Sequence, residues 1–393
     1  MIELCAKDLC TGCMACKQIC NLNAIQSRYI NGFLYPVINP EKCVECGRCA
    51  SVCPILNKMQ IVGLSHTVEE TCLAVWNKKD DVRMKSSSGG VFSAIAEKVL
   101  NDGGVVFGAA WNKDLTLVHE GIEDINNLDR LRRSKYVQSD TNDTFLSVKR
   151  FLQEGKRVLY CGTPCQIAGL RYYLGNKDYD KLLCLDVLCQ GVPSPVLFRK
   201  YIEEIEGEIG MEVDDCVFRT KEYGWRNGLY CLALHGRRGN KHHLLKFFFE
   251  RNAFYRSFFK EYFMRQSCYN CVFKNDRRGY FSDITIADFW RIGNKVPFSA
   301  PHYERGISAV VVNTTKGDSF LNSCSDSLEI VERSFGEFAT NGGLRCSSKP
   351  ENNDEALVYL QNHTWKETQK RYFPVTWQVR KFIVKRFLFQ RKG

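Results

Sequence analysis

The chain has 393 residues, of which 44% are hydrophobic and 25% are charged, and it contains 20 cysteines. This composition is that of an ordinary globular protein, and the length predicts two or three domains with a sizeable core. Residues 364–393 hold nine lysines and arginines against one glutamate, which is +8 of the net +11, so the nearly neutral remainder argues against a nucleic-acid-binding domain.

Residues 1–21 lack the apolar stretch of a secretory signal, and no charge-free run approaches the length of a transmembrane helix. We therefore expect a cytoplasmic protein. In such reducing surroundings, cysteines serve as free thiols or metal ligands rather than as disulfides.

Eight cysteines within residues 10–53 form two copies of the spacing C-x2-C-x2-C-x3-C. This spacing is typical of bacterial two-cluster ferredoxins, in which the fourth cysteine of each run binds the other cluster. Zinc knuckles and disulfides are the alternatives, but zinc sites pair two C-x2-C elements and leave the other cysteines without a role. We therefore expect one 4Fe–4S cluster on Cys10, Cys13, Cys16 and Cys53, and a second on Cys43, Cys46, Cys49 and Cys20.

Residues 58–71 look like a linker, and residues 72–76 predict a buried strand. A serine- and glycine-rich turn, Ser86–Gly90, then opens a predicted helix that stops at residues 102–104. Such a turn offers backbone N–H groups, hydroxyls and the positive end of the helix dipole, which suits a phosphate. The alternative is an N-cap followed by a tight turn, because a lone glycine-rich loop is a weak signal.

A basic segment, Arg130–Ser139, follows a predicted strand at residues 105–110. It holds three arginines, a lysine and a tyrosine within ten residues. One interpretation is a clamp for a polyanionic cofactor, with the tyrosine or glutamine near a ring system. The other is a solvated basic face.

Strands predicted at residues 158–160 and 182–189 alternate with helices at residues 145–154, 167–174 and 196–205, which indicates βαβ units and a parallel sheet. Thr163 is a natural N-cap and Pro164 a natural first helical residue, so Cys165 should lie in the first turn. There the helix dipole is expected to lower the pKa of the thiol. Cys165 and Cys189 would both lie at carboxyl ends of strands, where open α/β sheets bind ligands, whereas Cys161 is expected to be a packed thiol.

Beyond Cys216 the pattern changes to strands and long aromatic-rich helices, and the aromatic residues of 247–263 indicate core packing. Cys268 and Cys271 follow, and then an alternating strand at residues 282–290. A lone C-x2-C suits half of a zinc site, half of a cluster or no site at all. Together with Cys165 and Cys189 it would complete a third cluster, although these partners are distant in sequence.

Taken together, these segments resemble the coenzyme F-420 hydrogenase/dehydrogenase beta-subunit family, in its form with a fused N-terminal two-cluster ferredoxin domain. The resemblance covers residues 1–345. It is carried by residues 87–92 (SSGGVF), 134–139 (SKYVQS), 162–170 (GTPCQIAGL), 189–195 (CQGVPSP), 268–271 and 282–290 (SDITIADFW).

The resemblance implies a flavin, usually FAD, beside a 4Fe–4S cluster, and electron exchange between that flavin and a second redox carrier. It places flavin contacts at Ser87, Ser88, Gly89, Gly90, Lys135, Tyr136, Gln138, Gly162 and Thr163. It also makes Cys165, Cys189, Cys268 and Cys271 the ligands of a third 4Fe–4S cluster. The chain departs from the family at Arg133, Ala287 and Arg291, where glycine is common, and at Gln190, where relatives often have histidine.

The expected fold class is α+β and α/β. A ferredoxin domain at residues 1–60 precedes an α/β flavin-binding domain with a mixed sheet. That domain comprises a flavin-binding part at residues 70–150 and a part with the third cluster at residues 151–345. A helical basic tail at residues 350–393 suits a membrane-surface helix, docking on an acidic partner or packing on the body.

We expect an iron–sulfur flavoprotein oxidoreductase that moves electrons between a small-molecule redox substrate, with coenzyme F-420 as a candidate, and a redox protein partner. The partner would be a ferredoxin, or a hydrogenase or dehydrogenase subunit. Non-catalytic electron transfer on behalf of a separate enzyme is the first alternative, and a flavin-less structural iron–sulfur protein is the second. His302, Asp283 and Asp288 are candidates for acid–base catalysis, against structural roles for each.

Overall fold

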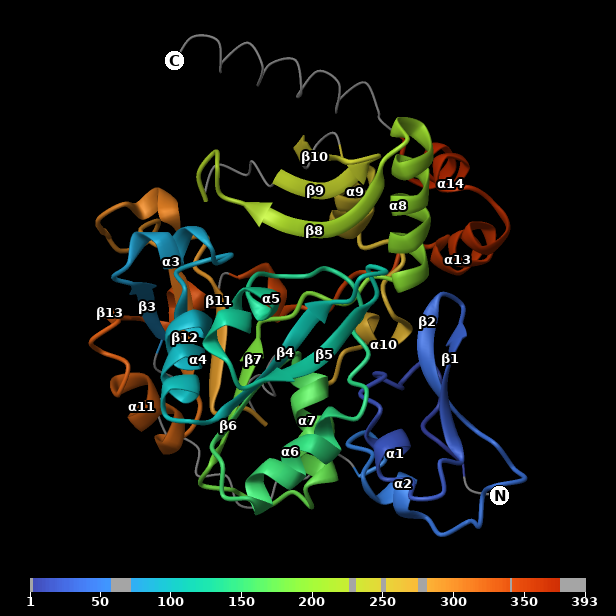
Figure 1. Cartoon of the computed structure of the whole chain (residues 1–393), viewed down its shortest axis with the longest axis horizontal. Coiled ribbons are helices and arrows are strands. Elements are labelled where there is room, and N and C mark those ends of the chain that lie inside the picture. The colour runs from blue at the N-terminus through green and yellow to red at the C-terminus, as the bar shows by residue number, and fades with distance from the viewer. Residues whose placement is uncertain are drawn as a thin grey trace.

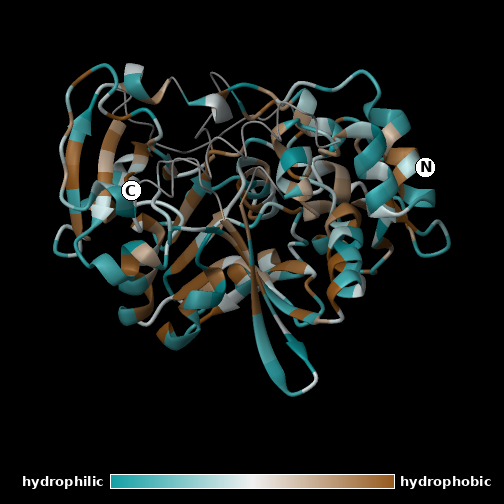
Figure 2. Cartoon of the chain, turned by 90° about the horizontal axis from the view of Figure 1, so that it is seen from above, coloured by the Kyte–Doolittle hydropathy of each residue, from teal (hydrophilic) through white to brown (hydrophobic). Residues whose placement is uncertain are grey.

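The computed structural model describes residues 3–57, 72–225, 231–248, 252–274, 281–339 and 341–374. Three parts are visible in Figure 1: a small N-terminal domain in blue, a large central sheet with helices, and a smaller sheet above it. Hydrophobic residues concentrate on the strands of the central region (Figure 2). No helix in the described ranges is both long enough and apolar enough to cross a membrane.

The N-terminal domain pairs two short helices with a hairpin. It contains α1 (Ala15–Gln18), β1 (Ile25–Ile30), β2 (Phe33–Ile38) and α2 (Arg48–Ser51), and β1 pairs with β2 in antiparallel fashion. The two cysteine runs share a backbone device, since residues on both sides of the second cysteine adopt positive φ. These are Gly12 and Met14 in the first run, and Glu45 and Gly47 in the second. The repeat seen in the sequence is thus a repeat in loop conformation.

The large sheet has eight strands in the order β13-β3-β12-β11-β7-β6-β4-β5. The central strands β11, β7, β6 and β4 run parallel, and the flanking strands pair in antiparallel fashion, so the predicted mixed sheet with βαβ units is confirmed. The strands are β3 (Cys72–Asn77), β4 (Val105–Trp111), β5 (Leu117–Ile122), β6 (Val158–Gly162), β7 (Leu182–Val187), β11 (Ile284–Asp288), β12 (Ser308–Val312) and β13 (Leu328–Arg333).

Helices cover both faces of this sheet because its parallel strands are apolar on both sides. Leu159 and Leu183 pack toward α4 (Val91–Asn101) and α11 (Thr315–Asn322). The next residues along each strand, Tyr160 and Cys184, pack toward α6 (Thr144–Gln153) and α7 (Pro164–Tyr173). The expected helices of this region are confirmed. Helices α7 and α6 also pack against α1 of the N-terminal domain.

The smaller sheet joins β8 (Glu212–Thr220), β9 (Cys231–Arg238) and β10 (Lys241–Phe248). The long aromatic helix predicted around residues 247–263 is wrong. Phe247 and Phe248 lie in β10, and α9 (Ala253–Phe259) has only seven residues. The predicted core role still holds for Phe254 and Tyr255, which are fully buried. Aromatic residues suit strands and helices alike, so their spacing could not distinguish the two.

Helices α8 (Pro195–Ile209), α13 (Asn353–Asn362) and α14 (Trp365–Tyr372) pack beside the smaller sheet, and Trp365 and Phe373 are buried in that cluster. The start of the expected tail is therefore part of the body, while residues 375–393, with the amphipathic segment, lie outside the described residues. The remaining short helices are α3 (Asp80–Met84), α5 (Leu128–Leu131), α10 (Gln266–Tyr269) and α12 (Phe335–Phe338).

Candidate metal centres and cofactor site

Several thiols of the N-terminal domain lie close to one another, and their division into two cluster sets stays a prediction. Burial and the nearby thiols of Cys13, Cys10, Cys53 and Cys49 raise the pKa of Cys16 well above its ordinary value, so Cys16 also lies near a thiol of the other predicted set. Burial, with a contribution from Cys43 and Cys46, raises the pKa of Cys49. The half-buried Cys20 lies just after α1.

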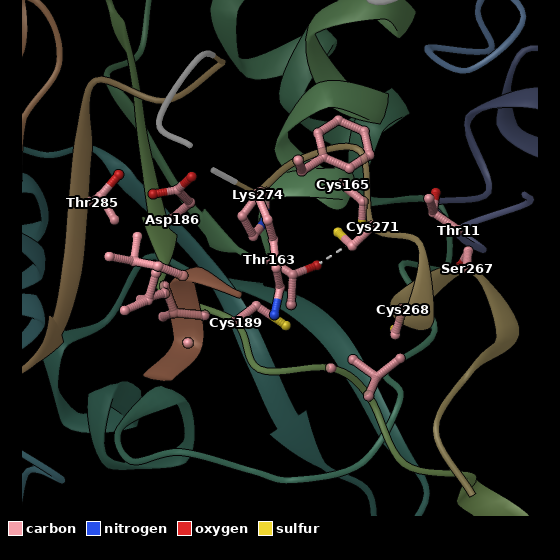
Figure 3. Close-up of a pocket in the computed structure, with 18 residues that line it drawn as sticks. Thr11, Thr163, Cys165, Asp186, Cys189, Ser267, Cys268, Cys271, Lys274 and Thr285 are labelled. Atoms are coloured by element: carbon pink, nitrogen blue, oxygen red, sulfur yellow. Dashed lines mark hydrogen bonds between the residues drawn. The ribbon is translucent and has the colours of Figure 1, made fainter. Parts of the chain in front are cut away.

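A third group of cysteines lies at the carboxyl edge of the large sheet. Cys165 follows β6, Cys189 follows β7, Cys268 lies in α10 and Cys271 comes just after it, and all four line one cavity (Figure 3). The chain thus brings together four thiols that are up to 106 positions apart in sequence. They surround the cavity from three elements, as the corners of a cubane cluster require.

No three His, Cys, Asp or Glu side chains among the described residues are close enough to bind a single metal ion. A 4Fe–4S cluster distributes its four thiolates over separate iron atoms, so it requires a wider arrangement than one ion does. The four cavity cysteines supply the ligand chemistry for such a cluster, because thiolate is the ligand that these clusters take.

The start of α7 forms as predicted, but the pKa of Cys165 differs from the prediction. Thr163 and Gln166 make a capping box, and Pro164 occupies the first turn. Burial nevertheless raises the pKa of Cys165 to about 11, outweighing the lowering effect of the Thr163 hydroxyl, whose Oγ1 lies 3.2 Å from the sulfur. The predicted lowering is therefore wrong, because the depth of burial is invisible in the sequence.

The cavity also contains a cation and a carboxyl group that the sequence analysis missed. Lys274 Nζ donates to the carbonyls of Gln190 and Arg345, at 2.9 and 2.7 Å. Asp186, at the end of β7, is buried, and burial raises its pKa to about 7. Cys346 also lies nearby, with its Sγ 3.6 Å from the carbonyl of Cys271. In the sequence, the only indication that Lys274 lies at the cavity is its position three residues after Cys271.

Cys13 links the N-terminal domain to the third cysteine group. The thiol of Cys165 is among those that contribute to the raised pKa of Cys13. Gly169, one helical turn after Cys165, faces the same residue, and a Cβ on it would lie 2.8 Å from Cys13 Sγ. Hydrogen bonds secure this docking, from Thr141 Oγ1 to the Cys13 carbonyl at 3.0 Å and from Phe145 N to Gln18 Oε1 at 2.8 Å.

The turn predicted to contact the flavin phosphates is largely bonded to its own chain. Ser87 Oγ accepts from Ser134 N, Ser88 Oγ donates to the Ile307 carbonyl and Gly89 N donates to Ser308 Oγ. A Cβ on Gly89 would lie 2.3 Å from the Val75 carbonyl, so packing alone requires glycine there. The part of this turn that could still bind an anion is the N-terminus of α4. Its N-cap residue, Gly90, has no side chain to cap the first N–H groups of the helix.

The other predicted flavin contacts are divided between several places. Gln138 faces the N-terminal domain, where its Oε1 accepts from Leu34 N at 3.1 Å. Lys135 is half-buried, burial lowers its pKa to about 8, and it has no ion-pair partner among the described residues. Tyr136 packs with Phe218 and Phe258, Gly162 ends β6, and Thr163 lines the cavity. Lys135 Nζ also donates to the Arg132 carbonyl at 2.8 Å, and the predicted flavin contacts stay a prediction.

Among the described residues, two of the four cations in the basic segment Arg130–Ser139 are paired with carboxylates. Arg130 Nε lies 2.5 Å from Glu120 Oε1, and Arg132 Nη2 lies 2.7 Å from Glu97 Oε1. Arg133 has a φ of 72°, a left-handed conformation that favours glycine, which accounts for the glycine common there in the family.

Two of the acid–base candidates, Asp283 and Asp288, form ion pairs and hydrogen bonds inside the protein, whereas His302 lies at the surface. Asp283 is fully buried, accepts from Cys184 N and pairs with Arg171 at 3.1 Å. Asp288 accepts from Arg219 and from Trp225 Nε1. His302 is 53% exposed beside Asp80 and Glu304.

Comparisons with known proteins match two parts of the chain. Residues 155–336 match the family described as the carboxyl-terminal part of the coenzyme F-420 hydrogenase/dehydrogenase beta subunit, and residues 9–56 match the 4Fe–4S dicluster domain. A relative from Methanosarcina mazei, one of the subunits of its F(420)H(2) dehydrogenase, is 22% identical over 355 residues, covering 84% of this chain and 86% of its own length.

Two further similarities are more distant. An uncharacterized polyferredoxin-like protein of Methanocaldococcus jannaschii is 31% identical over 70 residues, covering 15% of this chain and 41% of its own. A chain of the F-420-reducing nickel–iron hydrogenase complex from Methanosarcina barkeri aligns with a TM-score of 0.46 and 16% identity, covering 78% of this chain and 92% of that one. The expected resemblance is confirmed: residues 155–336 belong to the beta-subunit family of coenzyme F-420 hydrogenases and dehydrogenases, and residues 9–56 to the 4Fe–4S dicluster domains.

Proposed function

We propose that this chain is a cytoplasmic iron–sulfur flavoprotein subunit that carries electrons between a two-electron redox substrate and a protein partner. The observation that carries the proposal is the position of Cys165, Cys189, Cys268 and Cys271 around one cavity, next to the cysteine loop of the N-terminal domain. The four thiols at that position add a third cysteine set, in the large sheet region, next to the two sets of the N-terminal domain.

Three sets of cysteines would hold 4Fe–4S clusters: the cavity set, the set of Cys10, Cys13, Cys16 and Cys53, and the set of Cys43, Cys46, Cys49 and Cys20. The cavity set adjoins the Cys10, Cys13, Cys16 and Cys53 set through Cys165 and Cys13. That set in turn adjoins the Cys43, Cys46, Cys49 and Cys20 set through Cys16 and Cys49. Clusters at these sets would supply one-electron transfer, and a bound flavin would supply the exchange of electron pairs.

The residues around these sets keep them at fixed separations. Gly169 lets α7 approach the Cys13 loop, and Thr141 and Gln18 bond the two parts together. Cys46 is exposed, as is its neighbour Val44, so the outermost set faces solvent. That surface is where we place the redox protein partner.

FAD is the flavin that the family resemblance implies. Lys135 offers a half-buried cation, Tyr136 an aromatic ring, and the start of α4 the backbone N–H groups of a helix N-terminus for a phosphate. The relative from Methanosarcina mazei is named for F(420)H(2), which makes the reduced deazaflavin the first substrate to test.

The test is anaerobic mixing of the purified, cluster-loaded chain with reduced coenzyme F-420 and a viologen dye, followed by the absorbance of both. The proposal predicts oxidation of the coenzyme and reduction of the dye by this chain alone. If neither changes although clusters and flavin are bound, the chain does not use this substrate unaided.

Electron transfer without a substrate of its own is the second candidate. The hydrogen bonds that Ser87, Ser88 and Gly89 make within the protein favour this function, because their polar groups have partners without a phosphate. A chain that takes electrons from reduced ferredoxin, but neither binds flavin nor oxidises a small molecule, would support this function.

A further inference from the structure

A buried arginine connects the cavity to the N-terminal domain. Arg265 precedes α10, where its backbone N donates to the Val192 carbonyl and its carbonyl accepts from Cys268 N. Its side chain crosses into the N-terminal domain. Nε donates to the Cys10 carbonyl at 2.7 Å, Nη1 donates to the Leu34 carbonyl at 2.8 Å, and Nη2 lies 3.7 Å from Cys10 Sγ.

The guanidinium of Arg265 is buried without a paired carboxylate in the part of the chain that the structure describes. Arg265 is 0% exposed, and among the described residues no carboxylate lies within ion-pair distance of it. Besides the two carbonyls, the ring of Tyr35 contacts the cation, with its centroid 4.0 Å from Arg265 Cζ. Because arginine stays protonated in proteins, and an uncompensated buried charge is strongly destabilising, the site requires a negative charge close by.

The position of the guanidinium identifies where that charge should be. A Cβ on Gly12, between Cys10 and Cys13, would lie 2.9 Å from Arg265 Cζ, so the cysteine loop closes directly over the cation. Thiolates that bind a 4Fe–4S cluster are the anions available in this loop. Within the described residues, no lysine or arginine side chain donates a hydrogen bond to a thiol of the Cys43, Cys46, Cys49 and Cys20 set, so this N–H contact distinguishes the two sets.

We propose that Arg265 is a potential-setting residue, which stabilises the reduced state of the cluster held by Cys10, Cys13, Cys16 and Cys53 through its charge and its N–H to Cys10 Sγ. Hydrogen bonds to the sulfurs, net charge and solvent exposure determine the potentials of such clusters. Arg265 thus makes the middle of the three sets easier to reduce than it would otherwise be. The proposal rests on the proposed function for the presence of clusters, but not on the identity of the substrate.

The test is a redox titration of the anaerobic, cluster-loaded protein, followed by electron paramagnetic resonance, for wild type, Arg265→Gln and Arg265→Lys. We expect Arg265→Gln to weaken the reduction equilibrium of one cluster by about tenfold. For one electron, this makes its midpoint potential more negative by about 59 mV. Arg265→Lys should shift it less, because the charge remains, and the other midpoints should stay in place. Arg48→Gln, an exposed arginine between Cys46 and Cys49, is the matched control and should leave the middle cluster unchanged.

A second measurement needs no variant and remains decisive if Arg265→Gln fails to fold. Wild-type protein made with nitrogen-15 arginine should show a coupled nitrogen-15 nucleus on one reduced cluster in pulsed resonance spectra. An absence of this coupling, or equal potentials in wild type and Arg265→Gln at full iron content, would overturn the inference. A wild-type protein without clusters in the N-terminal domain would instead refute the proposed function itself.

Discussion

The N-terminal cysteine sets and the cavity set differ in how the sequence encodes their ligands. The first two draw on residues 10–53, where spacing and paired left-handed residues such as Gly12 and Glu45 shape each loop. The cavity set exists only when β6, β7 and α10 have come together. A local motif can therefore fold around its clusters, whereas the cavity set depends on the whole sheet.

The largest effect should come from removing one ligand of the cavity set. Cys165→Ser should remove one cluster and leave the N-terminal pair, so that iron falls from about twelve to about eight per chain. Cys161→Ser is the matched control, because Cys161 lies four residues earlier and does not line the cavity. Iron analysis and cluster absorbance measure the result, and equal iron in both variants would refute the third site.

The next largest effect should come from weakening the sheet that assembles the cavity. Asp283→Ala leaves the buried Arg171 without its closest carboxylate, which should cost about 3–5 kcal/mol of the free energy of unfolding. On heating, the cavity cluster should then be lost well before the N-terminal pair. Asp178→Ala removes a more exposed partner of Arg171, at 3.5 Å, and should cost about 1 kcal/mol or less. Simultaneous loss of all clusters in Asp283→Ala would contradict the difference between the two regions.

A smaller effect is expected at the contact between the regions. Gly169→Ala places a Cβ 2.8 Å from Cys13, and this overpacking should cost about 1–3 kcal/mol and slow electron transfer from cavity to N-terminal domain. Stopped-flow reduction of the separate clusters would measure the rate. Gly207→Ala in α8, where nothing lies within 4 Å, should leave that rate unchanged.

The smallest effect concerns pH, because Lys135 is only half-buried and solvent screens its charge, and it should be confined to the sheet region. Burial lowers the pKa of Lys135 to about 8, below the ordinary value of about 10.4. Between these two pH values the unfolded chain binds more protons than the folded chain, so stability should rise from pH 8 to about pH 10. Denaturant unfolding should show this rise in wild type and in the exposed-site control Lys113→Met, but not in Lys135→Met. A rise that persists in Lys135→Met would assign it to another group.

Sequence alone predicted the elements with strong local patterns. The cysteine spacing indicated the dicluster domain, and apolar runs located β3, β4, β6 and β7. It failed where a pattern fits two structures, as for Phe247 and Phe248, or where burial decides, as for the pKa of Cys165. The contact between Cys10 and Arg265 joins residues 255 positions apart, and no local pattern could indicate it.

The most direct test of the account is the iron, acid-labile sulfide and released flavin per chain in protein purified anaerobically. Three cysteine sets and one flavin site predict about twelve iron, about twelve sulfide and about one flavin per chain. About eight iron without flavin would mean that only the N-terminal domain binds clusters, and would contradict the third site.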